Sequence, residues 1–271
     1  MATILEKILA NTRRQVADRK TQTPLEALKA QAQSRPRCRH FYRAVTQPNR
    51  RGLNVIAEVK KASPSAGLIR PDFDPVRIAQ TYEACGADAI SVLTDETFFQ
   101  GRLEYLTAVK EAVKLPVLRK DFIVDPYQVY EARAAGADAI LLIADALTPS
   151  ALIDLLILAS DLTLTTLIEV HQADTLLQVR SLLGFPQKHY SVLGINNRDL
   201  QTMKVDINTT GRLAGLVEQR RELIAESGIR TREDVQKLIR LGIGGVLIGQ
   251  TLCAAEDIAA TFAELFDAEG R

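Results

Sequence analysis

Short apolar stretches alternate with helical segments along most of the chain. From residue 54 onward each apolar stretch has the length of one strand, and a longer helical stretch separates it from the next. This alternation is typical of parallel strands whose connecting helices pack outside the sheet. The pattern predicts eight strands, at residues 55–58, 89–93, 117–119, 139–143, 166–170, 191–195, 222–226 and 245–249.

An internal repeat supports this interpretation. The sequences GADAISVL at residues 86–93 and GADAILLI at residues 136–143 recur 50 residues apart, and LGIGGVLIG at residues 241–249 is a weaker copy. A period of this length accommodates two strand-and-helix units, so the repeat marks every second strand. Eight such units close into a (β/α)8 TIM barrel, a fold of about 250 residues.

The beginning of the chain predicts helices without strands. Residues 4–20 place apolar side chains at helical spacing among charged and polar ones. A second helix is predicted to begin at Thr23 and Pro24, because a hydroxyl cap followed by proline is a common helix start. This helix ends near Ser34.

The next segment, residues 35–52, contains two prolines and several arginines, which predicts an irregular connection into the barrel. We therefore expect two parts in the chain. Residues 1–50 form a helical extension, and residues 51–271 form the barrel that carries the chemistry.

Composition and charge narrow the class of partner. The 271 residues are 46% hydrophobic and 25% charged, which is enough to bury a real core. The formal net charge of +1 gives no broad field for nucleic acid or an anionic membrane, so we expect a small-molecule partner. No apolar run approaches the roughly 18 residues of a membrane span, and Glu6 and Lys7 interrupt the start too early for a signal peptide. We expect a cytoplasmic protein.

Cysteine and histidine usage gives no sign of a disulfide framework or a metal. Cys38, Cys85 and Cys253 are odd in number and widely spaced, so we interpret them as packing residues. Clustered histidine or carboxylate ligands are not evident, and lysines intervene between the acidic residues of interest. A dinucleotide-binding glycine fingerprint is also missing. We therefore expect neither a metal nor a cofactor.

Polar side chains follow several of the predicted strands at their carboxyl ends, where barrels of this kind place their active sites. Side chains alternate across a strand, so the acid and the lysine at the end of the first strand should point to the same side. A single such end could be solvated, but four strands that deliver them together favour a functional site. The residues are Glu58 and Lys60 on the first strand, Lys120 on the third, Glu169 on the fifth, and Asn196 and Arg198 on the sixth.

The seventh and eighth strands end in small residues. Ser227 and Gly228 follow the seventh strand, and Gly249 and Gln250 stand at the end of the eighth. Barrels often bind phosphate at these two positions, where glycine lets main-chain N–H groups approach the ligand. Each glycine taken singly could merely permit a tight turn. As a pair they favour a phosphate site, which Ser63 of the first loop could complete.

Lysines and glutamates in one pocket indicate proton transfer. Burial and like charges lower the pKa of a lysine while glutamates oppose this, so one lysine could serve as a general acid near neutral pH. No activated nucleophile is evident, and we interpret His171 as structural because Glu169 already has the inward direction. The residue pattern by itself indicates a cofactor-free lyase or isomerase that acts on a phosphorylated, anionic substrate.

Ordered motifs along nearly the whole chain carry a family resemblance. They are ILEKILANTRRQVADRK, EVKKASPSAGLIRPDFDP, LTDETFFQG, LRKDFIVDPYQVYEARAAGADAILLI, LIEVH, GINNRDL and ESGI. In these motifs the chain resembles the indole-3-glycerol phosphate synthase family. The resemblance implies a substrate, carboxyphenylamino-deoxyribulose phosphate, and three products: indole-3-glycerol phosphate, carbon dioxide and water. This would be a late step of tryptophan biosynthesis.

The resemblance also implies roles for the residues of the pocket. Lys120 protonates the alkoxide that develops during ring closure, and Lys60 pairs with the substrate carboxylate or acts as an acid in the loss of water. Glu169 is the base in dehydration, and Glu58 holds the lysine and the substrate amine. The remaining contacts implied are polar groups at Asn196 and Arg198, phosphate at Ser63, Ser227, Gly228, Gly249 and Gln250, and the aromatic ring at Phe122 and Phe99.

In this family the extension caps the substrate pocket, and we expect a monomer or a weak homodimer. Two positions depart from the family pattern. Ala66 stands where lysine is usual, and Gln250 stands where serine or glutamate is commoner. These departures keep a noncatalytic scaffold open as an alternative. A phosphosugar isomerase such as phosphoribosylanthranilate isomerase is a second alternative, but it would need cysteine or aspartate where the first strand offers Glu58 and Lys60.

Overall fold

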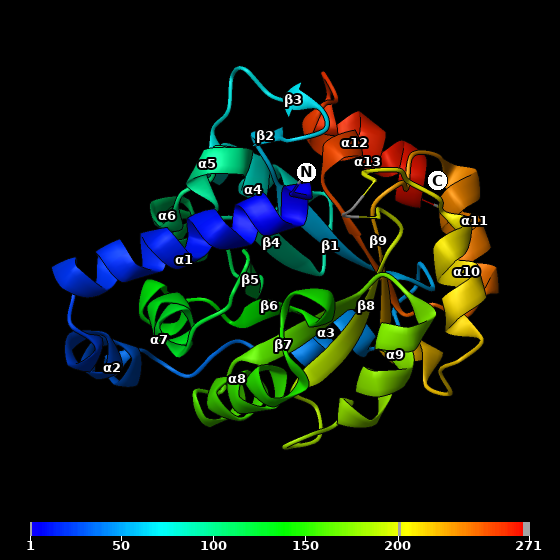
Figure 1. Cartoon of the computed structure of the whole chain (residues 1–271). Coiled ribbons are helices and arrows are strands. Elements are labelled where there is room, and N and C mark those ends of the chain that lie inside the picture. Colours follow the sequence, from blue (N-terminus) through cyan, green and yellow to red (C-terminus); the bar gives the residue numbers. More distant parts are fainter. Residues whose placement is uncertain (1, 200–201, 268–271) are drawn as a thin grey trace.

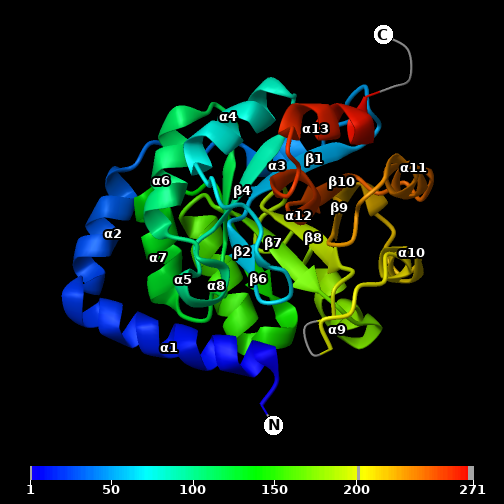
Figure 2. The same cartoon turned by 90° about the horizontal axis from the view of Figure 1, so that it is seen from above.

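Eight parallel strands close into a barrel in the computed structural model, which describes residues 2–199 and 202–267. The strand order around the barrel is β1, β10, β9, β8, β7, β6, β5 and β4 (Figures 1 and 2). The (β/α)8 prediction is confirmed, and no predicted strand boundary is wrong by more than one residue. The strands are β1 Asn54–Val59, β4 Ala89–Leu93, β5 Val117–Lys120, β6 Ala139–Ile143, β7 Thr165–Val170, β8 Ser191–Asn196, β9 Leu223–Glu226 and β10 Gly245–Ile248.

Helices surround the strands, as the view down the barrel shows (Figure 2). The outer helices are α4 Pro75–Ala84, α6 Leu103–Ala112, α7 Pro126–Ala135, α8 Pro149–Asp161, α9 Ala173–Val179, α10 Asn208–Ala214, α11 Arg232–Arg240 and α13 Ile258–Phe266. Shorter helical pieces lie in the loops: α5 Glu96–Phe99, α12 Gln250–Cys253, and the 3-10 turns η1 Ala144–Ala146, η2 Arg180–Leu182 and η3 Arg220–Glu222. None of the helices in the described residues combines the length and apolarity that a membrane crossing requires.

The sequence repeat corresponds to one structural device used twice. Gly86 and Gly136 follow helices with positive φ angles of 85° and 96°, a conformation that glycine adopts without strain. Two residues later, the carboxylate of Asp88 accepts a hydrogen bond from Val55 N at 2.7 Å. Asp138 accepts one from Val117 N at 2.8 Å in the same way. Each aspartate therefore satisfies a backbone donor at the start of the neighbouring strand.

The segment before the barrel contains α1 Ile4–Gln22, α2 Leu25–Ser34 and α3 Phe41–Thr46. Two details of the prediction are wrong. Pro24 itself precedes α2 without a side-chain cap, and Thr23 instead ends α1, where its carbonyl accepts a hydrogen bond from the Tyr127 hydroxyl. The connection is also not wholly irregular, because α3 forms where Phe41 and Val45 are fully buried near the amino ends of the strands.

A two-stranded hairpin, β2 Ala62–Ser63 and β3 Gly67–Leu68, occupies the first loop after β1 and was not predicted. Ala66 lies in its turn and donates a backbone hydrogen bond to the Ser63 hydroxyl at 3.2 Å. The hairpin lies at the same end of the barrel as α5 (Figure 1). The first loop is therefore an ordered element beside the carboxyl end of β1.

Candidate active site

The carboxyl ends of the strands surround a pocket that opens to solvent. Both charged and apolar side chains line it, as is usual for a small-molecule site. All of the site residues predicted from the sequence line this pocket: Glu58, Lys60, Ser63, Phe99, Lys120, Phe122, Glu169, Asn196, Arg198, Ser227, Gly228, Gly249 and Gln250. The barrel thus brings residues from seven strand ends and their loops to one place.

The acid and the lysine of β1 point to the same side, as their spacing predicts. Lys60 Nζ lies 2.8 Å from Glu58 Oε1, and the Glu58 side chain is almost completely buried. The Ser91 hydroxyl, on the adjacent strand β4, contacts the other carboxylate oxygen of Glu58 at 3.4 Å. Lys60 Nζ also lies 5.8 Å from the centre of the Phe99 ring. This ammonium is therefore held at the pocket wall by a carboxylate and an aromatic face.

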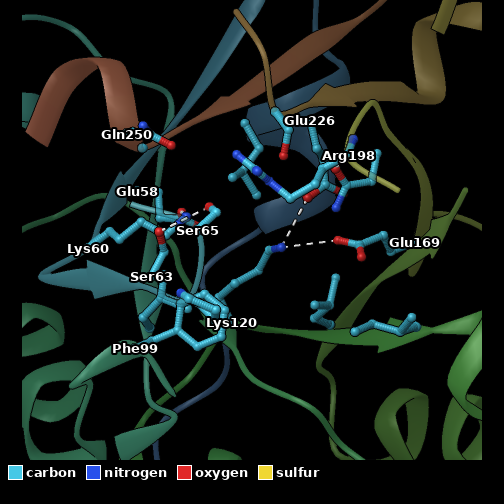
Figure 3. Close-up of a pocket in the computed structure, with 18 of the residues that line it drawn as sticks. Glu58, Lys60, Ser63, Ser65, Phe99, Lys120, Glu169, Arg198, Glu226 and Gln250 are labelled. Carbon is cyan, nitrogen blue, oxygen red and sulfur yellow. Dashed lines mark hydrogen bonds and ion pairs between the residues drawn. The ribbon is translucent and has the colours of Figure 1, made fainter. Parts of the chain in front are cut away.

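Lys120, at the end of β5, lies between two carboxylates (Figure 3). Its Nζ is 3.1 Å from Glu169 Oε2 and 3.1 Å from Glu226 Oε2. Burial lowers the pKa of Lys120, but the negative charges of Glu169, Glu226 and Glu58 outweigh burial and raise it above its ordinary value. Lys120 therefore stays charged at neutral pH.

The two carboxylates beside Lys120 differ in protonation. Burial raises the pKa of Glu226 to about 8, because the adjacent charge of Glu169 offsets part of the attraction of Lys120. For Glu169 burial also opposes ionisation, but Lys120 and His171 outweigh it and lower the pKa. The surroundings therefore favour the ionised form of Glu169 and the protonated form of Glu226. An ionised base and a protonated acid thus flank one ammonium group.

Glu226 is a pocket residue that the sequence analysis missed. It is the last residue of β9 and is almost completely buried. A signal was present, because Glu226 ends the predicted seventh strand and lies two residues after Ile224, an interior residue of the barrel. Of the ESGI motif, roles were assigned from the sequence only to Ser227 and Gly228, which follow the glutamate.

Small residues line another part of the pocket. Ser227 and Gly228 both have positive φ angles, 65° and 80°. A serine in this conformation costs roughly 1 kcal/mol and persists only where its surroundings enforce it, often at functional sites. Gly249 precedes α12 and Gln250 is the first residue of that helix. These residues and Ser63 of the β2–β3 hairpin lie around the same pocket.

Asn196 is the last residue of β8, and Arg198 follows two residues later. The Asn196 side-chain oxygen accepts a hydrogen bond from Arg198 N at 3.0 Å, and the Arg198 guanidinium donates to Met203 O at 3.2 Å. Burial and the charge of Arg230 lower the pKa of Arg198. The guanidinium of Arg198 at the pocket favours an anionic ligand.

Aromatic and aliphatic side chains close the remaining wall. The rings of Phe99 and Phe122 lie 6.0 Å apart between centroids. Ile4, Leu5 and Ile8, from the first turns of α1, line the same pocket. The helix that begins the chain therefore contributes directly to the apolar wall.

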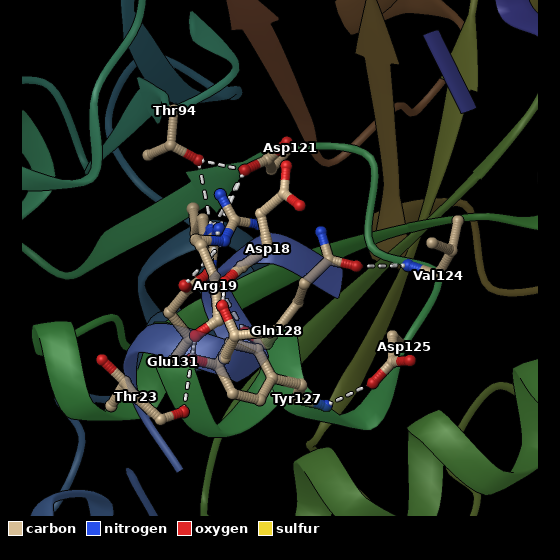
Figure 4. A network of polar contacts seen from close by, with 12 residues as sticks. Asp18, Arg19, Thr23, Thr94, Asp121, Val124, Asp125, Tyr127, Gln128 and Glu131 are labelled. Atoms are coloured by element: carbon tan, nitrogen blue, oxygen red, sulfur yellow. Dashed lines mark hydrogen bonds and ion pairs between the residues drawn. The ribbon is translucent and has the colours of Figure 1, made fainter. Parts of the chain in front are cut away.

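A buried ionic network includes the residues before and after Lys120 in the sequence, Arg119 and Asp121, and Figure 4 shows Asp121, Glu131 and Arg19 in it. The Arg119 guanidinium, 1% exposed, lies 3.0 Å from Asp121 Oδ2 and 2.8 Å from Glu131 Oε2. Glu131 uses its other oxygen to pair with Arg19 Nε of α1 at 3.1 Å. Residues on both sides of Lys120 are thus fixed, and the same carboxylate fastens α1 to α7.

Within residues 2–199 and 202–267, no group of three or more histidine, cysteine, aspartate or glutamate side chains is arranged to hold a metal ion. The glutamates of the pocket are interleaved with lysines, whose positive charge repels a cation.

Comparison with known proteins assigns the family. A model of the family described as indole-3-glycerol phosphate synthase matches residues 5–265. The chain therefore belongs to the indole-3-glycerol phosphate synthase family. An indole-3-glycerol phosphate synthase of Rhodopirellula baltica is 48% identical over 256 residues, which cover 94% of this chain and 96% of that protein. The synthase of Geobacillus thermodenitrificans is 46% identical over 263 residues, 97% of this chain and 96% of that protein.

Solved structures agree with the fold at a greater distance. A mutant tryptophan synthase alpha-subunit from Pyrococcus furiosus superposes with a TM-score of 0.57 at 13% identity, covering 79% of this chain and 97% of that one. At this identity the likeness concerns the barrel alone. The indole-3-glycerol phosphate synthase assignment rests on the family model and the curated relatives.

Proposed function

We propose that the chain converts carboxyphenylamino-deoxyribulose phosphate into indole-3-glycerol phosphate, carbon dioxide and water, a carboxy-lyase step of tryptophan biosynthesis. Membership of the indole-3-glycerol phosphate synthase family supports this reaction. The observation in the pocket that carries it is Lys120, whose ammonium lies 3.1 Å from both Glu169 and Glu226. A charged acid and its proton-exchanging partners meet there without any need for a cofactor.

Ring closure is the first chemical step. The aromatic carbon that bears the carboxylate attacks the ketone carbon of the sugar, and the carbonyl electrons move to oxygen. Lys120 donates a proton from Nζ to this oxygen as negative charge develops. The raised pKa of Lys120 keeps the lysine protonated beforehand. Glu226, with its pKa raised to about 8, can then return a proton to Lys120.

Decarboxylation follows. The bond between the ring carbon and the carboxylate breaks, and its electrons restore the aromatic ring. Until then the carboxylate pairs with Lys60, which Glu58 holds at 2.8 Å. Glu58 thus acts by keeping Lys60 oriented and by contacting the substrate amine.

Loss of water completes the indole. A hydroxyl group leaves with a proton from Lys60, and Glu169 accepts the proton that leaves the neighbouring carbon. The lowered pKa of Glu169 keeps it ionised for this role.

The rest of the pocket binds and orients the substrate. Phe99 and Phe122 flank the aromatic ring, and Asn196 and Arg198 contact polar and anionic groups. The phosphate binds among the small residues of the pocket, where glycines let main-chain N–H groups approach. These residues are Ser63, Ser227, Gly228, Gly249 and Gln250.

The helical extension, residues 1–50, caps the barrel of residues 51–271 in this proposal. Ile4, Leu5 and Ile8 of α1 support it because they line the pocket. An apolar cap excludes water and strengthens the electrostatic contacts beneath it. We further propose that the enzyme works in the cytoplasm as a monomer or a weak homodimer.

A direct assay tests the function. Purified protein without added metal or cofactor is mixed with carboxyphenylamino-deoxyribulose phosphate, and the fluorescence of the indole product is followed. We expect fluorescence to rise. Tight substrate binding without any rise would instead favour the noncatalytic alternative and direct attention to Ala66 and Gln250.

Replacing Lys120, the proposed proton donor, tests its role directly. Lys120→Met should lower kcat by about a hundredfold or more, because the alkoxide loses its proton donor. Substrate binding, measured by quenching or calorimetry, should change little since other residues hold the phosphate and the ring. Undiminished turnover in Lys120→Met would remove Lys120 from this role.

A further inference from the structure

His171 belongs to a chain of polar contacts that ends at Glu169. It follows β7, and its side chain is only 7% exposed. One ring nitrogen, Nδ1, lies 2.8 Å from Asp145 Oδ2 in η1, and the other, Nε2, lies 3.3 Å from Glu169 Oε1. The Thr175 hydroxyl of α9 donates to the second oxygen of Asp145. The order is therefore Thr175, Asp145, His171, Glu169.

The two oxygens of Glu169 have different partners. Lys120 contacts Oε2 from β5, while His171 contacts Oε1 from the end of the glutamate's own strand. His171 does not line the pocket, so substrate meets Glu169 and not the imidazole. A histidine that served only to pack the loop would not need a carboxylate oxygen within 3.3 Å of each ring nitrogen.

We propose that His171, oriented by Asp145, is a positioning residue that fixes the Glu169 carboxylate and keeps it ionised as the base in dehydration. The proposal rests on the function proposed above, whose base it concerns. It revises the purely structural interpretation of His171. The charge of the imidazole then matters as much as its shape.

The surrounding charges are consistent with a protonated imidazole. Burial lowers the pKa of His171, but Asp145 and Glu169 outweigh it and raise the pKa to about 10. Glu169 is faced by Lys120 from β5 and His171 from its own strand as cations, and by Glu226 from β9 as an acid that largely keeps its proton. Loss of the imidazolium would leave Lys120 as the single adjacent cation among these groups.

Histidine NMR tests the first half of the proposal without any turnover. The chain has three histidines, and the spectrum of His171→Gln assigns the resonance of His171. We expect this resonance to keep its imidazolium position up to at least pH 8 in the wild type. In Asp145→Asn it should titrate at least about one pH unit lower, because an opposite charge is lost. Titration of His171 near its ordinary value of about 6.5 in the wild type would overturn the proposal.

Kinetics test the second half. In His171→Gln the acid limb of the kcat profile should move upward by about one pH unit or more, since Glu169 becomes easier to protonate. Asp145→Asn should move the acid limb in the same direction, but by a smaller amount. The matched control is His40→Gln, which makes the same change at an exposed histidine and should leave the limb in place.

A merely structural role gives a different result. His171→Gln would then lower the melting temperature while the acid limb stayed at its wild-type position, and this outcome overturns the proposal. Absence of turnover in the wild type would count against the proposed function, whereas the NMR titration would still decide the position and charge of His171. The two failures are therefore distinguishable.

Discussion

Two glycines leave the space that buried carboxylates of this pocket occupy. A Cβ on Gly249 would lie 2.5 Å from Glu58 Oε1, and one on Gly194 would lie 2.2 Å from Glu226 Oε1. Both distances are far inside van der Waals contact. The glycines stand on β8 and after β10, beside the strands that carry the two glutamates. Each glutamate thus lies flat across its neighbouring strand only because a side chain is missing there.

Gly249→Ala tests this packing. The added methyl group should displace the Glu58 carboxylate and release Lys60, lowering kcat by about tenfold or more through lost orientation of the ammonium. The control is Gly215→Ala, whose Cβ meets no atom closer than 3.8 Å and whose φ of −64° suits alanine. Steady-state kinetics of the two variants decide the matter. Equal activity in both would mean that Glu58 tolerates the displacement or is not needed.

Single residues also mark the limit of sequence interpretation. Glu58 and Lys60 were paired correctly because strand alternation fixes their side. Glu226 was missed as a pocket residue, and the high pKa of Lys120 was not foreseen. The pKa of Lys120 depends on how many carboxylates converge on one ammonium, which is decided by strands far apart in sequence. No local pattern contains that number.

At the level of elements, the strands were the most predictable feature. In a parallel barrel each strand is buried on both faces, so it appears as a short apolar run with clear ends. The β2–β3 hairpin and α3 were not predicted. Two-residue strands carry too little pattern, and α3 forms because the barrel end buries Phe41 and Val45. Tertiary contact overrides local composition in both cases.

The helix α1 depends on a contact that the sequence does not reveal. Arg19 near its carboxyl end pairs with Glu131 at 3.1 Å, and its first turns line the pocket. Arg19→Met should loosen this attachment and raise KM several-fold, while the loss of stability stays near about 1 kcal/mol because Arg19 is partly exposed.

Arg13→Met is the matched control for Arg19→Met. Arg13 is exposed on the same helix, so its replacement removes a positive charge without removing this ion pair. Kinetic constants and urea unfolding of both variants separate the two effects. A KM that rose equally in both variants would show that net charge, and not attachment of α1, controls substrate capture.

For the whole molecule, the pocket places charge where a barrel is otherwise apolar. Glu58, Glu169 and Glu226 are each at most 3% exposed, and burying ionisable groups lowers stability even where lysines pair with them. Proteins commonly accept such a loss of stability where function requires it. The barrel supplies the compensating burial through its interior and through the outer helices.

The stability of the fold should therefore depend on the ionisation of Glu226. Its pKa is raised from 4.5 to about 8 on folding, so between these values the folded state holds a proton that the unfolded state releases. The folded state binds more protons, and stability from this group consequently falls as pH rises through the window. Below pH 4.5 both states are protonated and the group contributes nothing. Glu226→Gln removes the titration.

We expect the free energy of unfolding of Glu226→Gln to rise relative to that of the wild type between about pH 5.5 and pH 8. The expected change is on the order of 2 kcal/mol. Urea unfolding at the two pH values measures this difference, in which the titration of all other groups largely cancels. Glu264→Gln makes the same change at an exposed glutamate and should run parallel to the wild type. If Glu226→Gln also ran parallel, Glu226 would have to be ionised throughout, and it could not return a proton to Lys120. A variant more stable at pH 8 but slower in turnover would place the conflict between stability and catalysis at this one carboxyl group.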